Sequence, residues 1–142
     1  AATDTAAWNS TTPTASVFTV GTGANVNTSA ATYVTYTAAS LAGISKIGTY
    51  TGNGTTQTIN CGFAAGARFI LIKASSTTGA WTVIDSTRGI VAASDPYLLL
   101  NSVAAEVTTE DCVDPDNSGF IVNTTTAALN TNAVVYQYWA IA

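Results

Sequence analysis

Short runs of apolar and β-branched residues, separated by glycine and asparagine at intervals of roughly eight to twelve residues, constrain this chain most. Several runs alternate apolar with polar residues, as half-buried strands do. The sequence therefore predicts an all-β fold, an antiparallel and jelly-roll-like β-sandwich of roughly eight to ten short strands. The expected strands are Val17–Val20, Thr32–Ala38, Lys46–Thr51, Gln57–Asn60, Arg68–Lys73, Trp81–Asp85, Tyr97–Leu100, Gly119–Asn123 and Val134–Ile141.

Two local patterns say more about the centre of this fold. The run Phe69-Ile70-Leu71-Ile72 shows no polar alternation, so we expect both faces of this strand to be covered. Asn53-Gly54 is the strongest hairpin signal, because this dipeptide takes the positive φ that a type I′ turn requires.

The cysteines, Cys61 and Cys112, either form one disulfide or are two separate buried thiols, and the sequence leaves both interpretations open.

Composition excludes several classes of function. Charged residues make up 8% of the chain against 47% hydrophobic residues, so threonine, serine and asparagine must supply the polar surface. The 4 Lys and Arg residues are too few to neutralise the phosphates of a nucleic acid. No apolar run approaches the ~18 residues of a membrane span. The absence of histidine excludes a histidine-dependent nucleophile and a zinc site of the usual kind.

An internal repeat relates the two ends of the chain. Ser16–Tyr36 is similar to Ser118–Trp139: Phe18 matches Phe120, Val20 matches Val122, Asn27-Thr28 matches Asn130-Thr131 and Tyr33 matches Tyr136. Each copy predicts a strand, a polar loop and a second strand with tyrosine. We therefore expect a main sandwich domain at 41–142 and, at 1–40, an N-terminal arm with a repeat-like hairpin. That hairpin either packs on the main domain or is the tail of an upstream copy.

Acidic residues give two weak candidate sites. Five of the eight acids lie between Glu106 and Asp116, and a solvated acidic turn explains them better than a pair of catalytic carboxylates. Asp114, Asp116 and Ser118, followed by glycine, resemble the first half of a calcium loop. The twelfth position of that loop is Thr125, where a bidentate glutamate would be needed. Pro115 and Asn117 already explain a turn here, so calcium remains a weak alternative.

One resemblance indicates a family. The segments Ser45–Gly54, Gly62-Phe63, Phe69–Lys73, Trp81–Asp85, Asn101–Glu106, Ser118–Phe120 and Asn130–Trp139 resemble a β-rich domain that recurs in virion surface proteins of tailed phages, especially marine and freshwater phages. The resemblance covers residues 43–142 well and the first forty more loosely, through the repeat. It implies a surface domain of a tail fibre or similar appendage. It implies no catalytic residues.

The resemblance therefore leads us to expect a non-enzymatic virion structural protein, exposed on the particle, that contributes to host attachment. Its expected partners are copies of itself, with a trimer by analogy, other virion proteins and a host surface glycan; no cofactor is expected. Two alternatives stay open. One is a capsid decoration protein that clamps neighbouring subunits, for which Ala1–Ala7 could act as an arm that adds a strand to a neighbour's sheet. The other is an extracellular filament subunit linked by strand exchange.

The candidate ligand or interface residues follow from turns and exposed aromatics. The resembled family carries a charged turn after the apolar strand, whereas this chain has Lys73-Ala74-Ser75-Ser76-Thr77-Thr78. This difference indicates a loop that is either buried against a neighbour or adapted to another partner. Aromatic rings on a rim can stack on sugars, although many are cross-strand partners. The candidates are Asn53, Gly54, Ser75, Ser76, Thr77 and Trp81.

Overall fold

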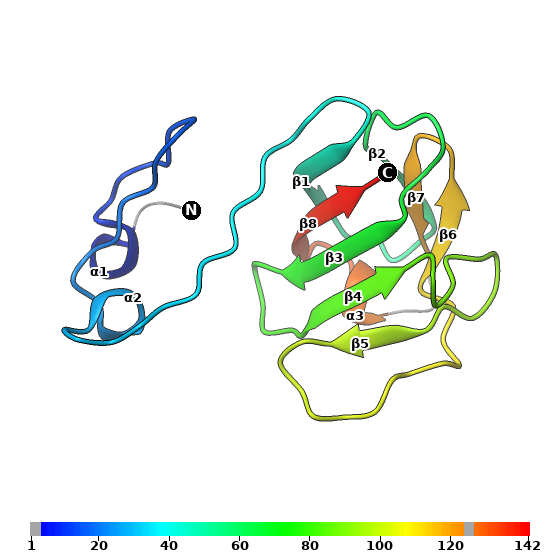
Figure 1. The fold of residues 1–142 in the computed structure, drawn as a ribbon. Coiled ribbons are helices and arrows are strands. Elements are labelled where there is room, and N and C mark those ends of the chain that lie inside the picture. Colours follow the sequence, from blue (N-terminus) through cyan, green and yellow to red (C-terminus); the bar gives the residue numbers. More distant parts are fainter. Residues whose placement is uncertain (1–3, 124–126) are drawn as a thin grey trace. The chain divides into compact units, whose positions relative to one another are not determined.

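The computed structural model describes residues 4–123 and 127–142, and it divides the chain into two units (Figure 1). The N-terminal unit is Ala1–Thr37, and the sandwich unit is Ala38–Ala142. The division falls close to the boundary at residue 40 that the sequence indicates. The two units are described separately below.

The sandwich unit consists of two antiparallel sheets, so the predicted all-β sandwich is confirmed. The five-stranded sheet has the order β1-β8-β3-β4-β5, and the three-stranded sheet has the order β2-β7-β6. A single-turn helix, α3 (Ala127–Asn130), precedes the last strand. The strands are β1 (Ser45–Thr51), β2 (Gln57–Asn60), β3 (Phe69–Ala74), β4 (Trp81–Asp85), β5 (Tyr97–Leu99), β6 (Val113–Asp116), β7 (Gly119–Val122) and β8 (Val135–Ile141).

The strand order is nested like that of a jelly roll in its first half. The first strand pairs with the last, β2 pairs with β7 in the other sheet, and β3 returns beside β8. The order departs from a jelly roll at β4, β5 and β6, which pair with their neighbours in sequence. Because β1 and β2 belong to different sheets, the predicted Asn53-Gly54 hairpin is wrong. Gly54 does take the positive φ of 69°, but at a corner between the sheets.

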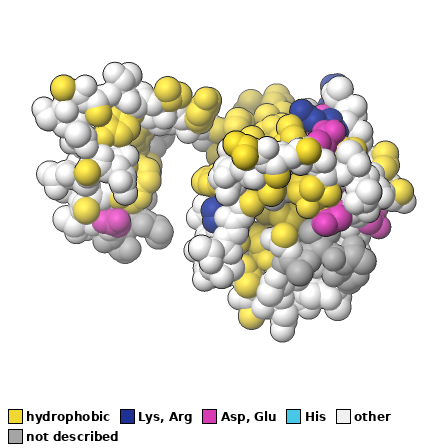
Figure 2. Space-filling view, turned by 90° about the horizontal axis from the view of Figure 1, so that it is seen from below, with side chains coloured by type: hydrophobic (Ala, Val, Ile, Leu, Met, Phe, Trp, Pro, Cys, Tyr) yellow, Lys and Arg dark blue, Asp and Glu magenta, His cyan; other side chains and the backbone are white. Residues whose placement is uncertain are grey.

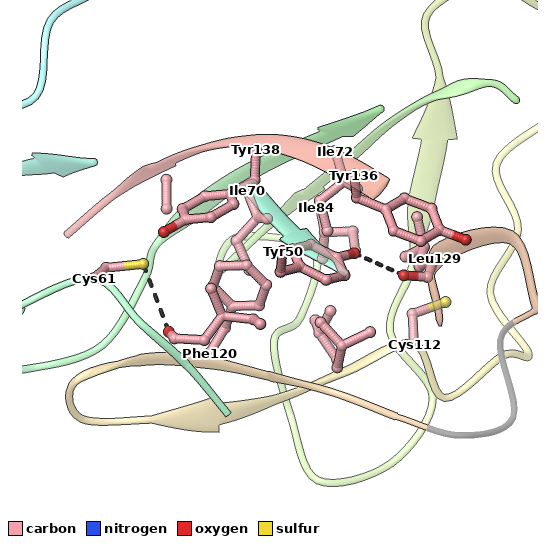
Figure 3. Packing of buried hydrophobic residues seen from close by; sticks show 14 of the residues in the cluster. Tyr50, Cys61, Ile70, Ile72, Ile84, Cys112, Phe120, Leu129, Tyr136 and Tyr138 are labelled. Carbon is pink, nitrogen blue, oxygen red and sulfur yellow. Dashed lines mark hydrogen bonds between the residues drawn. The ribbon is translucent and has the colours of Figure 1, made fainter. Parts of the chain in front are cut away.

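The core lies between the two sheets and is rich in aromatic residues (Figure 3). Tyr50 stacks on Tyr136 with ring centroids 5.0 Å apart, and Phe120 meets Tyr138 edge-on at 5.6 Å. The Tyr50 hydroxyl donates to the Leu129 carbonyl at 2.7 Å, which satisfies a polar group inside the core. Burial, with a smaller contribution from nearby Cys61, raises the pKa of Tyr138 to about 12.

The strand expected at the centre of the core is β3, the middle strand of the five-stranded sheet. Ile70 and Ile72 are fully buried, whereas Phe69 and Leu71 on the other face are half-buried. The expectation that both faces are covered is therefore wrong for the outer face. An apolar run without alternation marks a strand with two apolar faces, and it does not say whether a second layer covers both of them.

Cys61 and Cys112 are both buried and form no disulfide, so the structure has two separate thiols. They lie at opposite sides of the core cluster (Figure 3). The Cys61 thiol donates to the Ile59 carbonyl at 3.6 Å, and burial raises its pKa. Both therefore behave as small apolar core residues.

Two parts of the chain differ from the strands expected. Strand β6 includes Pro115 and was not predicted; proline is tolerated because β6 is an edge strand of its sheet. Val17–Val20 and Thr32–Ala38 form no strand in the described part of the N-terminal unit, which instead contains α1 (Thr5–Trp8) and α2 (Ala24–Asn27).

The expected extended arm at Ala1–Ala7 is wrong where the structure describes it. Asp4 caps α1, because its carboxylate accepts from the backbone N–H groups of Ala6 and Ala7 at 2.8 and 3.1 Å. Residues 1–3 lie outside the described residues.

Candidate ligand-binding end of the sandwich

The candidate residues predicted from sequence come together at one end of the five-stranded sheet. Thr51 pairs with Val135, and Ala74 pairs with Tyr136. The turn after β1, the loop after β3 and the start of β8 therefore lie side by side, and β4 begins at this end too. Asn53, Gly54, Ser75, Ser76, Thr77 and Trp81 all lie at this end, which we call the loop end (Figure 1).

Buried Asn130 holds the 52–55 turn in place. Its Oδ1 accepts from the Asn53 backbone N–H at 3.1 Å and from Gln57 Nε2 at 2.8 Å. Its Nδ2 donates to the carbonyls of Thr55 at 2.7 Å and Asn123 at 3.4 Å. The predicted tip, Asn53 and Gly54, is exposed but fixed from beneath. Asn130 was not among the candidate ligand or interface residues, although the match of Asn27-Thr28 with Asn130-Thr131 in the internal repeat had already drawn attention to it.

The loop after β3 is fixed to the start of β8. Ser75 donates from both its backbone N–H and its hydroxyl to the Val135 carbonyl, at 2.8 and 3.1 Å. The Ser76 hydroxyl accepts from the Val135 N–H at 2.9 Å. Two of the predicted ligand hydroxyls thus hold the loop itself, and Thr77 is exposed at its tip.

Trp81 is the exposed aromatic residue of the loop end. Its side chain is 44% exposed, and its backbone N–H donates to Asn101 Oδ1 at 2.8 Å. Lys73 pairs with Trp81 on one side and with Gln137 on the other. Directly paired residues point to the same face of a sheet, so an ammonium and an amide share the outer face with the indole.

The same outer face carries an apolar row across all five strands. The register Ile47–Trp139–Leu71–Val83–Leu98 places one apolar residue from each strand in line. The Phe69 and Trp139 rings meet edge-on at 5.5 Å. Figure 2, a view from below, shows yellow hydrophobic side chains on the sandwich unit next to a cluster of blue and magenta charged side chains. We call this set the outer row; the sequence analysis did not identify it.

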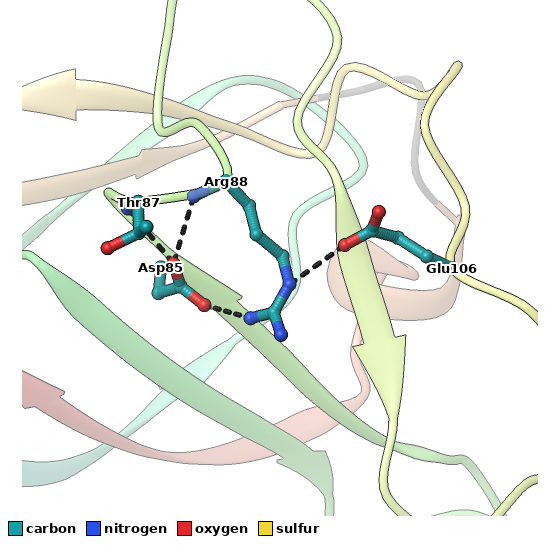
Figure 4. A network of polar contacts seen from close by, with 4 residues as sticks. All are labelled: Asp85, Thr87, Arg88 and Glu106. Atoms are coloured by element: carbon teal, nitrogen blue, oxygen red, sulfur yellow. Dashed lines mark hydrogen bonds and ion pairs between the residues drawn. The ribbon is translucent and has the colours of Figure 1, made fainter.

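The acidic residues between 106 and 116 have separate partners. Arg88 forms ion pairs with Asp85 and, through Nε at 2.8 Å, with Glu106 (Figure 4). The pair with Asp85 closes the turn after β4, and Glu106 adds a second carboxylate to it. The Tyr97 hydroxyl donates to Glu110 at 3.3 Å, and burial, followed by the charge of Glu110, raises the pKa of Tyr97 to about 12.

The weak calcium candidate lies in the β6–β7 hairpin. Asp116 Oδ1 accepts from the Ser118 backbone N–H at 2.8 Å and hydroxyl at 2.6 Å, which lowers the pKa of Asp116. Asp114 Oδ1 is buried without a hydrogen-bond partner. Thr125, the twelfth loop position, lies outside the described residues. Within residues 4–123 and 127–142, no group of three or more acidic or cysteine side chains could hold a metal ion.

A shallow pocket of about 410 Å³ lies at the opposite end of the sandwich. The start of β3 and the β6–β7 hairpin form it, and Arg68, Ser86 and Asp116 line it among other residues. Arg68 and Asp116 add two opposite charges to a lining that is otherwise mixed polar and apolar, and the sequence analysis did not single this pocket out.

The comparisons with known proteins identify a family. The family model described as a domain of unknown function, DUF7483, matches residues 1–142, so the chain belongs to that family. No curated protein and no solved structure matches the chain. Among the described residues, no helix is long and apolar enough to cross a membrane.

Proposed function

We propose that this member of DUF7483 is a non-enzymatic structural domain of a bacteriophage virion, exposed on the surface of a tail fibre or similar appendage, where it contributes to attachment to the host. The resemblance of residues 43–142 to phage virion domains supports this proposal. So does the loop end, where two fixed loops and an exposed tryptophan lie at the same end of the sheet, because rigid loops at one end of a sandwich are a common binding surface.

Trp81 is the observation that carries the proposal. An exposed indole flanked by polar side chains offers an apolar plane and hydrogen-bonding groups together, which suits the face of a sugar ring. Lys73 is the cross-strand neighbour of Trp81, Gln137 lies one strand further on the same face, and Asn101 Oδ1 accepts from the Trp81 backbone N–H. Many weak copies of such a site gain avidity on a multivalent appendage. The ligand class that we propose is a glycan of the host surface.

A glycan array tests this proposal. We expect the full chain to bind a subset of surface glycans and Trp81→Ala to weaken that binding tenfold or more, since a central tryptophan contributes about 2 kcal/mol at such sites. Trp8→Ala is the matched control, because Trp8 is also exposed but lies in the N-terminal unit. A silent array, or equal binding by Trp81→Ala, would contradict the proposal.

The outer row favours a second candidate, a capsid decoration protein. Of the outer row, Ile47 is exposed, Val83 is buried and the other three residues are half-buried. This partly exposed apolar line suits a contact with a neighbouring subunit, since exposed apolar patches mark interfaces. The two candidates differ in copy number on the particle. A decoration protein is present in hundreds of copies, and a fibre domain in a dozen or a few dozen.

A further inference from the structure

The two copies of the internal repeat have the same local structure. The helix α2 (Ala24–Asn27) corresponds to α3 (Ala127–Asn130), with the one-residue difference falling before each helix. The backbone N–H after the Asn donates to a tyrosine hydroxyl in both copies: Thr28 to Tyr33 at 2.8 Å, and Thr131 to Tyr136 at 3.0 Å.

Two further details agree between the copies. Asn27 Nδ2 donates to the Gly21 carbonyl at 2.9 Å, as Asn130 Nδ2 donates to the Asn123 carbonyl at 3.4 Å. Ala30 and Ala133 both take a positive φ, 61° and 63°, which non-glycine residues rarely adopt. These four matching features make residues 21–33 a structural copy of α3 and the turns on either side of it, between β7 and β8.

The copies differ in what surrounds them. Phe120 and Val122 are 0% exposed in the core, whereas their counterparts Phe18 and Val20 are 41% and 37% exposed. Tyr136 is 1% exposed, and its counterpart Tyr33 is 42% exposed. The flanking segments of the first copy form no strand in the described part of the chain, while those of the second pair on both sides within a sheet. The first copy thus has the pattern of a core segment without a core around it.

We propose that residues 16–38 are a complementing segment for a second copy of this chain, in which they fill the place of β7, α3 and β8. Phe18 and Val20 would enter the core where Phe120 and Val122 lie, and Tyr33 would take the place of Tyr136 against Tyr50. At the positions where the C-terminal segment has Tyr138 and Ala140, the first segment has Thr35 and Thr37. The C-terminal segment of a chain therefore fits the core of its own sandwich better than the first segment of another copy does. The complementing segment therefore enters a sandwich whose own β7–α3–β8 segment has left it. This inference does not depend on the proposed function.

Complementation in trans tests this inference. The acceptor is the full chain carrying Phe18→Asp together with Phe120→Asp, so that neither of its own two segments can place a phenylalanine in the core. The donor is the full chain with an affinity tag, and the two are co-expressed. We expect the tagged full chain to retain the acceptor in a soluble complex of equal stoichiometry.

Two variants of the donor test whether the first segment of the donor is the part that binds the acceptor. Full-chain Phe18→Asp should lose the acceptor, because a carboxylate cannot replace the buried ring. Full-chain Ser29→Asp, with the same charge change at an exposed position of the same segment, should retain it. Equal capture by the Phe18→Asp donor would mean that the C-terminal segment is exchanged instead, and no capture by any donor would mean that the first segment does not fit. Either result would overturn the inference.

Discussion

Asp95 shows how one buried side chain organises a loop of this charge-poor molecule. It is fully buried; its carboxylate accepts from the backbone N–H of Val91 through Oδ1, and from those of Cys112 and Val113 through Oδ2, each at 3.0 Å. It thereby joins the loop before β5 to the start of β6. Burial raises the pKa of this carboxyl, and the three backbone hydrogen bonds partly oppose that rise.

Asp95→Ala should lower the free energy of unfolding by about 3 kcal/mol or more, because it leaves three N–H groups without their acceptor. Because the pKa of the native carboxyl lies above its usual 3.8, the folded state binds this proton more readily than the unfolded chain. The contribution of Asp95 to stability therefore grows as pH falls and is lost as pH rises through the folded pKa.

Urea unfolding of both proteins from neutral pH down to about 4 measures this. The stability gap between wild type and Asp95→Ala should widen as pH falls. A gap that narrows would show that the pKa of the carboxyl is lowered by its hydrogen bonds and not raised by burial.

At the scale of elements, the local sequence pattern predicted a strand correctly wherever that segment also finds a neighbouring strand in one of the sheets. Seven of the eight strands were expected within two residues of their bounds, including β3 and the long β8. Strand β6 was missed because a proline and two aspartates in its four residues do not resemble a strand, although an edge strand tolerates them. Val17–Val20 and Thr32–Ala38 were predicted as strands because they copy the pattern of β7 and β8. A strand also needs neighbouring strands to pair with, and the sequence pattern of one segment does not show whether they are present.

The helix-and-turn junction around Asn130 gives a prediction at this scale. Asn130→Ala removes four hydrogen bonds in the core and should lower the free energy of unfolding by about 2–4 kcal/mol. The control, Asn27→Ala, changes the equivalent residue of the repeat, which is exposed, and should cost no more than about 0.5 kcal/mol. Thermal and urea unfolding measure both, and equal losses would contradict the role given to Asn130.

At the scale of the whole molecule, register decides which residues meet. The candidates at 53–54, 75–77 and 81 were chosen separately from turn chemistry and aromatic character, and no sequence rule placed them at one end. Their convergence follows from β8 pairing with both β1 and β3. The outer row is also a property of register, because its five residues lie far apart in sequence. These two features support a domain that meets other surfaces through its loop end and its outer sheet face.

The most direct test of this account is the position and copy number of the chain on intact particles whose genome encodes it. Fab fragments raised against the full chain would be imaged on those particles by electron cryomicroscopy. The account predicts label on a tail fibre or similar appendage, in a dozen to a few dozen copies. Label spread over the capsid in hundreds of copies, or no label on the particle, would contradict it.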